Sequence, residues 1–215
     1  MIADLPKTPN HVKFCDVLQN DSIPLVLSTG PAGVGKTLMG ISIAIYKLIN
    51  RDINKVVITR PTVPLQEELG FLPGNLQDKM HPYLVPIYDS FKEYITVQRL
   101  NEYINNEEIE IAAVAHIRGR TFHNSWVIVD EAQNLTTMQY RTLLTRIGQN
   151  TKMVVSGDLN QSDLKEKNGL QDFIERYKLY AQENGENSFI GMVELGDEDI
   201  MRSEIVKNVL DIYKY

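Results

Sequence analysis

Short, continuously apolar runs recur along the chain and set its rhythm. They are IPLVLSTG (23–30), KVVITRP (55–61), IEIAAV (109–114), SWVIVDEA (125–132), KMVVSGD (152–158) and FIGMVEL (189–195). These runs are rich in Val and Ile and do not alternate with polar residues, which is typical of strands buried on both faces. The pattern predicts a mostly parallel sheet.

Helical patterns lie between these runs. LMGISIAIYKLIN (38–50) is apolar almost all round and predicts a buried helix, and residues 169–185 and 203–215 predict amphipathic helices. In residues 135–149, Thr136 and Gln139 form a capping-box pattern, and Gly148 stands where a carboxyl-terminal cap is expected. Strands that alternate with helices indicate one α/β domain over residues 1–215, a three-layer sandwich with helices on both faces.

One segment, residues 61–92, departs from this rhythm because it holds five of the nine prolines. We interpret it as a structured excursion that carries short helices, at a strand end where binding sites often lie. Met80, Tyr83, Tyr88 and Phe91 have helical spacing there and are expected to form a packing face. Asp197, Glu198 and Asp199 are interpreted as a solvated acidic turn.

Composition adds limits to this picture. The 215 residues are 43% hydrophobic, and no window reaches the length of a membrane helix or a signal-peptide core. The single cysteine, Cys15, is expected to be a packed thiol in a cytoplasmic protein without disulfides. A net charge of −6 argues against binding nucleic acid over the whole surface, but it allows a local basic groove.

The loop GPAGVGKT carries the strongest chemical signal. It fits G-x-x-x-x-G-K-[ST] and stands between a predicted strand and a predicted helix. Glycines let successive backbone N–H groups turn toward a phosphate chain, and the helix that follows contributes its positive dipole end. We expect ATP to bind here, with Lys36 on the β- and γ-phosphates and the Thr37 hydroxyl on Mg²⁺. The predicted nucleotide-binding residues are Gly30, Pro31, Ala32, Gly33, Val34, Gly35, Lys36, Thr37 and Leu38.

Polar residues follow two other strands and complete the predicted site. Asp130 is expected to hold Mg²⁺, and Glu131 to accept a proton from the attacking water. Neighbouring strand residues point to opposite faces, so the chain must bend after Asp130 for both acids to serve one site. Gln161 is the candidate sensor of the γ-phosphate. Lys36, Glu131 and Gln161 are the catalytic residues that these motifs predict.

Together these segments resemble the PhoH-like proteins, P-loop ATPases with a RecA-like fold related to the first motor domain of superfamily 1 helicases. The resemblance rests on GPAGVGKT, ITRP, LGFLPGNLQDKMHPYLVPIYD, IRGRTFHNS, VIVDEAQN, LTRIG, KMVVSGDLNQSDL and Met201-Arg202. It implies that Arg202 stabilises charge on the leaving phosphates, that Arg118 and Arg120 lie near the nucleotide or at a subunit junction, and that Glu67 matches a family glutamate. Where related sequences often place an Asn-Gln pair that reads adenine, this chain has Asn10-His11.

The resemblance also implies a partner. We expect a homo-oligomer, such as a ring-shaped hexamer, in which a neighbouring subunit completes the nucleotide site with an arginine. Arg60 occupies the position where helicase relatives touch a single strand, and residues 116–123 mix cations with a phenyl ring. The sequence leaves two readings open, a motor on RNA or single-stranded DNA and a nucleotide-dependent switch or scaffold for a protein partner. A small-molecule kinase is disfavoured because residues 61–92 lack the arginines of a phosphate lid.

Overall fold

The computed structural model describes residues 6–61, 76–164 and 167–201, together with positions 205, 208, 209 and 212; it does not describe the side chains of residues 76–83 and 115. Arg202 and Glu67, which were singled out above, lie outside the described residues. Among the described residues, no helix combines the length and apolar character needed to cross a membrane.

Six parallel strands form one sheet in the order β3-β2-β4-β5-β1-β6, as the apolar runs predicted. Their bounds are β1 Leu25–Thr29, β2 Lys55–Arg60, β3 Ile109–Ala113, β4 Ser125–Val129, β5 Lys152–Gly157 and β6 Ile190–Glu194. Parallel strands require crossover connections, and helices supply them. The α/β class is therefore confirmed.

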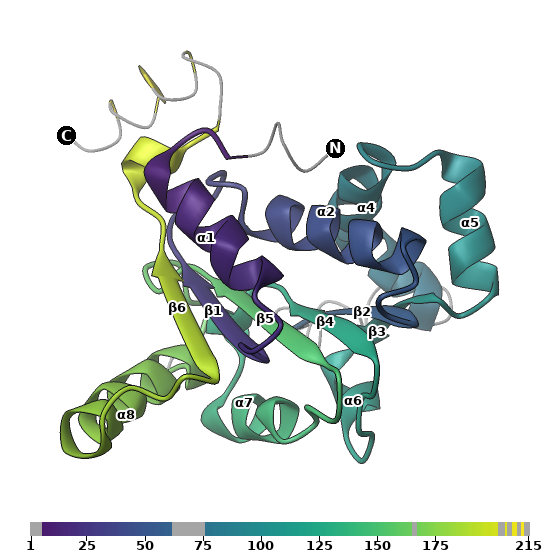
Figure 1. Cartoon of the computed structure of the whole chain (residues 1–215). Helices are drawn as coiled ribbons and strands as arrows, with labels where there is room; N and C mark the ends of the chain where they lie inside the picture. Colours follow the sequence, from purple (N-terminus) through teal and green to yellow (C-terminus); the bar gives the residue numbers. More distant parts are fainter. Residues whose placement is uncertain are drawn as a thin grey trace.

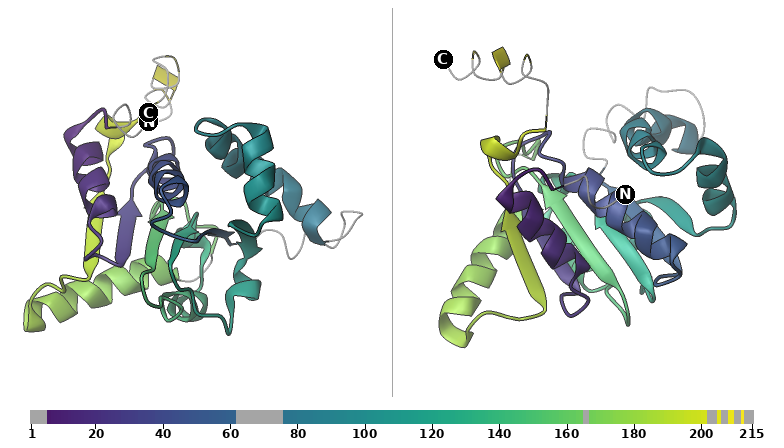
Figure 2. Two further views of the ribbon diagram at one scale, coloured as in Figure 1. Left: turned by 45° about the vertical axis from the view of Figure 1, so that its right-hand side comes forward. Right: turned by 45° about the horizontal axis from the view of Figure 1, so that its top comes forward.

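Helices cover both faces of this sheet (Figures 1 and 2). One face carries α1 (Pro9–Gln19), α2 (Lys36–Ile49), α4 (Leu76–Lys92) and α5 (Val97–Asn105). The other carries α6 (Val114–Ile117), α7 (Thr137–Leu144) and α8 (Gly169–Asn184). Two short 3-10 helices, η1 (Ala132–Asn134) and η2 (Asp197–Asp199), follow β4 and β6.

Alternate residues of each strand feed two separate cores. In β4, Trp126 and Ile128 pack with the helices of the α2 side, whereas Val127 and Val129 pack with those of the α7 side. Phe91 is fully buried and Tyr88 packs against the first core, which confirms the predicted packing face for these two residues. The side chains of Met80 and Tyr83, its other two predicted members, lie outside the described part of the chain. Residues 76–92 form one long helix, so the expectation of short helices is wrong for this half of the excursion.

The predicted helix over residues 135–149 is shorter than expected. Its capping box is confirmed, but α7 ends at Leu144 with Thr145 as its cap, so Gly148 is not a helix cap. Residues 146–149 run instead beside the loop segment that leads into β4, where the N–H of Phe122 donates to the carbonyl of Arg146. A Cβ on Gly148 would lie 2.3 Å from the carbonyl oxygen of Phe122, so glycine is needed for this close approach.

A buried lysine ties α1 to the amino-terminal end of β5. Lys152 is 6% exposed, and its ammonium donates to the carbonyls of Val17, Leu18 and Asn20 at 3.2, 2.6 and 2.7 Å. Burial lowers the pKa of Lys152 to about 8, so the charged form still predominates at pH 7. The cation thus caps the carboxyl end of α1, where the last carbonyls lack helical partners.

We expect Lys152→Met to lower the free energy of unfolding by about 2 kcal/mol, because buried carbonyls would lose their donor. Urea denaturation followed by circular dichroism measures this loss. Lys92→Met is the matched control, since its ion pair with Asp89 is exposed and its removal should cost less than about 0.5 kcal/mol. Equal midpoints for Lys152→Met and the wild type would show that the cap contributes nothing.

Candidate functional site

The loop between β1 and α2 is held in a conformation that only glycine accepts at several positions. Gly30, Gly33 and Gly35 have φ values of 146°, 90° and 83°, and Gly35 is the residue before α2. A Cβ on Gly30 would lie 2.2 Å from the carbonyl oxygen of Leu195. The loop therefore curls at the amino-terminal end of a 14-residue helix, where backbone N–H groups and the helix dipole favour an anion.

The chain segments before β1 and after β6 support this loop from outside. His11 is fully buried, and its Nε2 lies 3.0 Å from the carbonyl oxygen of Val34. The backbone N–H of Lys7 donates to His11 Nδ1, so Nε2 is the ring nitrogen left to donate to the loop. On the other side, the N–H of Met201 donates to the carbonyl of Gly33 at 3.1 Å.

The acidic turn after β6 takes part in the same support. Asp199 is 1% exposed and accepts hydrogen bonds from Thr8 Oγ1, from Asn10 Nδ2 at 2.9 Å and from the N–H of Gly196 at 2.8 Å. Burial acts to raise the pKa of Asp199, but these donors lower it below its ordinary value. The interpretation of residues 197–199 as a solvated turn is therefore wrong for Asp199, which fastens η2 to α1.

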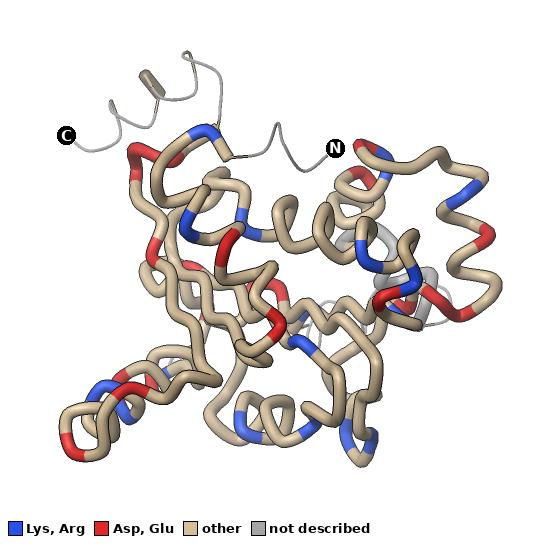
Figure 3. Tube along the Cα trace, viewed as in Figure 1, with Lys and Arg blue, Asp and Glu red and all other residues tan. Residues whose placement is uncertain are grey.

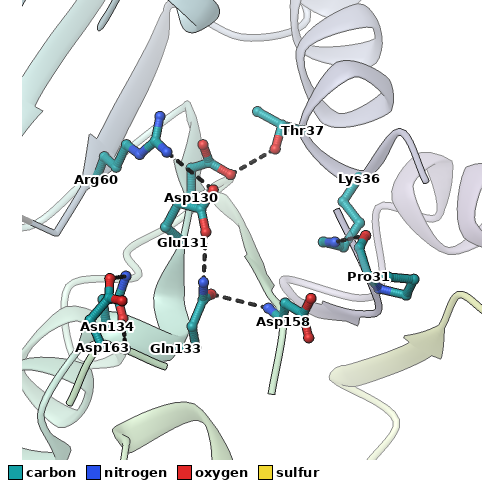
Figure 4. Close-up of polar contacts among 10 residues, drawn as sticks. All are labelled: Pro31, Lys36, Thr37, Arg60, Asp130, Glu131, Gln133, Asn134, Asp158 and Asp163. Carbon is teal, nitrogen blue, oxygen red and sulfur yellow. Dashed lines mark hydrogen bonds and ion pairs between the residues drawn. The ribbon is translucent and has the colours of Figure 1, made fainter. Parts of the chain in front are cut away.

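Lys36 points back over the loop. Its Nζ donates to the carbonyl of Gly30 at 2.7 Å. It also donates to the carbonyl of Pro31 at 2.8 Å (Figure 4). Burial lowers its pKa, while the charges of Asp158, Glu131 and Asp130 act in the opposite direction. The loop thus presents a partly buried cation next to its backbone N–H groups, a combination that suits a polyphosphate.

Thr37 and Asp130 lie in contact although they are far apart in the sequence. Thr37 Oγ1 donates to Asp130 Oδ1 at 2.7 Å, and Asp130 is 8% exposed. Burial raises the pKa of Asp130, an effect that a divalent cation beside the carboxylate would oppose. A hydroxyl and a carboxylate are hard oxygen ligands of the kind Mg²⁺ prefers, so the donor set fits this ion.

The bend required after Asp130 is present. Glu131 has a φ of 52°, the left-handed region that side chains other than glycine seldom adopt. Its Oε1 accepts from Arg60 Nη2 at 3.1 Å, and its Oε2 accepts from Gln133 Nε2 at 2.6 Å. Both acids after β4 therefore reach the same end of the sheet.

A second turn, after β5, is fastened to the turn after β4. Gln133 is 2% exposed, and its Oε1 accepts from the N–H of Asp158 at 3.0 Å. Asn134 and Asp163 exchange hydrogen bonds at 3.1 and 2.9 Å. These contacts fix the turn that carries Gln161, the predicted γ-phosphate sensor.

A pocket of about 390 Å³ joins these parts. Nine of its lining residues were predicted from the sequence: Ala32, Gly33, Gly35, Lys36, Thr37, Leu38, Asp130, Glu131 and Gln161. Three other predicted loop residues do not line the pocket. Gly30 and Pro31 accept hydrogen bonds from Lys36, which does line it, and Val34 is fully buried. The residues that sequence reasoning missed are Pro86, Ser90, Ser156, Gly157 and Asp158. Asp158 directly follows a buried strand, a signal that could have identified it, whereas Pro86 and Ser90 arrive through the packing of α4.

Two predicted arginines do not line this pocket. Arg120 forms a bidentate ion pair with Glu110, in which Nη1 donates to Oε1 at 2.6 Å and Nη2 to Oε2 at 2.8 Å. Arg118 is exposed and also lies outside the pocket lining. Hydrogen bonds from Arg120 lower the pKa of Glu110 to about 2. Within one chain, Arg120 therefore neutralises a carboxylate of β3, and its predicted contact with nucleotide stays a prediction.

Comparison with known proteins gives a consistent match over most of the chain. The family described as PhoH-like protein matches residues 5–214. A PhoH-like protein of Synechocystis is 36% identical over 210 residues, 97% of this chain and 61% of that protein. Protein PhoH of Escherichia coli K12 is 38% identical over 197 residues, which cover 90% of this chain and 54% of that protein. A PhoH-like protein of Bacillus subtilis is 40% identical over 191 residues, which cover 88% of this chain and 58% of that protein. The chain thus spans little more than half the length of these relatives.

Proposed function

The chain belongs to the PhoH-like protein family, and from that premise we propose that it is a Mg²⁺-dependent ATPase that acts on RNA or single-stranded DNA. The observation that carries the hydrolysis proposal is the meeting of three separate segments in one pocket. Lys36 and Thr37 come from the loop before α2, Asp130 and Glu131 from the turn after β4, and Gln161 from the turn after β5. Phosphoryl transfer needs these three parts: a phosphate cradle, a metal anchor and a group that positions water.

Each residue has a defined task in this proposal. The loop N–H groups and Lys36 would bind the triphosphate, and Thr37 and Asp130 would hold the metal, either directly or through its water shell. Bound Mg²⁺ would neutralise charge on the β- and γ-phosphates. Glu131 would orient the attacking water and accept its proton, while Gln161 would contact the γ-phosphate.

The nucleic-acid part rests on a basic surface over α6, α7 and the loop 118–124. Segments 111–129 and 132–157 contain no Asp or Glu, and Figure 3 shows blue and no red positions in α7 and in the loop that follows α6. His116, Arg118 and Arg141 are exposed, and Arg146 is partly exposed; we call these four residues the α6–α7 basic surface. In a chain of net charge −6, this local excess of guanidinium groups suits a phosphate backbone.

We also propose that the protein assembles as a homo-oligomer, such as a ring-shaped hexamer, with an arginine donated between subunits. Arg118 supports this part of the proposal because it is exposed and lies outside the pocket of its own chain. An arginine supplied from a neighbouring subunit can raise the rate by about 10³–10⁵.

The test is an ATPase assay with and without Mg²⁺ and poly(U) RNA. We expect turnover only with Mg²⁺, stimulation by poly(U), and loss of that stimulation as salt rises. Arg141→Gln should reduce stimulation, whereas Arg51→Gln, which removes an exposed arginine outside this surface, should not. Turnover that ignores poly(U) at low salt would favour a nucleotide-dependent switch for a protein partner instead.

A further inference from the structure

Both carboxylate oxygens of the candidate base, Glu131, accept hydrogen bonds. Figure 4 shows its side chain between Arg60 and Gln133, with distances of 3.1 Å to Arg60 Nη2 and 2.6 Å to Gln133 Nε2. Lys36 and Thr37, which mark the triphosphate and metal positions, approach from a different element. A carboxylate held in this way must loosen one of its contacts before it can turn toward a water at the γ-phosphate.

The two contacts differ in how readily they can be given up. Gln133 is 2% exposed, and its other amide atom is engaged by the N–H of Asp158. Arg60 ends β2, and its side chain is 26% exposed, with 38% exposure for the Glu131 side chain. An ion pair at such exposure is weak because solvent screens it. Arg60 is therefore the contact that an incoming ligand can take over.

Arg60 also stands next to the basic surface. It pairs in register with Ala113, the residue that directly precedes α6. A strand that lies along His116 and Arg118 would thus pass close to the end of β2. The planar guanidinium can bind two phosphate oxygens at once, a geometry that suits it to a phosphodiester.

We propose that Arg60 restrains Glu131, and that a phosphodiester of single-stranded nucleic acid frees Glu131 by binding Arg60. This inference rests on the proposed ATPase and names how its partner would control it. Arg60 is here a positioning residue, because it acts on hydrolysis through Glu131. The Glu131 carboxylate and the phosphodiester compete for the guanidinium of Arg60, and such competition is reciprocal. Removing the carboxylate must therefore strengthen binding of the phosphodiester, just as removing Arg60 releases the carboxylate.

Reciprocity gives a test that needs neither ATP nor Mg²⁺. Binding of fluorescein-labelled oligo(U) is measured by anisotropy over a range of salt concentrations. Glu131→Gln should tighten binding by about two- to fivefold, the strength of an exposed ion pair. Arg60→Gln should weaken binding and reduce the salt slope by about one. The matched pair Glu108 and Arg51 forms an exposed ion pair elsewhere, so Glu108→Gln and Arg51→Gln should change neither quantity.

The second test is steady-state hydrolysis. Arg60→Gln should raise basal kcat by about two- to fivefold with KM unchanged, and should remove most of the stimulation by poly(U). Arg60→Lys should retain part of the restraint and part of the stimulation, because the charge remains. A merely structural arginine would lower kcat when it is replaced.

The outcomes separate this inference from the function on which it rests. If the wild type hydrolyses ATP and Arg60→Gln is no faster, the restraint is overturned. It is also overturned if Glu131→Gln binds oligo(U) no more tightly than the wild type. Faster basal hydrolysis by Arg60→Gln without any effect of poly(U) on the wild type would overturn the phosphodiester as the releasing ligand. Failure of the wild type to hydrolyse ATP with Mg²⁺ under any condition would refute the proposed function itself.

Discussion

Lys36→Ala is expected to lower ATP hydrolysis by about 10²–10³, since removing one charge-stabilising donor from a transition state typically costs that much. ATP affinity should fall with it, because Lys36 is the cation that the loop itself places in the pocket. Equilibrium binding of a fluorescent ATP analogue and a phosphate-release assay measure the two effects.

Lys47→Ala is the control for this change. Lys47 lies on the same helix, α2, but pairs with Asp21 and lies outside the pocket that Lys36 lines. Its replacement should leave both measurements near the wild-type values. Normal ATP binding by Lys36→Ala would contradict the assignment of the loop as the triphosphate site.

Glu131→Gln is expected to lower turnover by about 10²–10⁴, the usual contribution of a general base, while ATP binding is retained. The amide keeps the size of the side chain but cannot accept the proton of the attacking water. Single-turnover hydrolysis and nucleotide binding, measured on the same preparation, separate chemistry from affinity.

Glu108→Gln removes a glutamate that also pairs with an arginine, Arg51, but lies outside the pocket, so its turnover should equal that of the wild type. Unchanged turnover in Glu131→Gln would remove Glu131 from its role as the base. Loss of ATP binding in the same variant would assign Glu131 to holding the pocket together instead.

Much of the site was predictable because its residues are attached to signals that are local in sequence. The glycines, Lys36 and Thr37 form a contiguous loop motif, and Asp130, Glu131 and Gln161 follow buried strands. Parallel strands bring their carboxyl ends to one edge of a sheet, so residues after such strands meet without further information. The bend at Glu131 was required by the alternation of strand side chains and is present as a left-handed residue.

Other features were not predictable because they depend on which surfaces pack together. The fold brings α4 over α2, which places Pro86 and Ser90 at the pocket. It brings residues 146–149 beside Phe122, and α7 ends before them. Gly148 must therefore be glycine because it lies close to the carbonyl of Phe122, and not because it caps a helix. It also buries Asp199 between Thr8 and Asn10, although the run of three acids resembled a solvated turn.

The sequence by itself determined the order of strands and helices, the glycine-rich loop and the two acids of the candidate site, because apolar periodicity and motif spacing are local properties of the chain. Only the tertiary structure decided what each charged side chain touches. It paired Arg120 with Glu110, placed Lys152 under the end of α1 and set Arg60 against Glu131. Those pairings join residues 10 to 135 positions apart. The distance between two such groups is fixed only when the elements that carry them have packed.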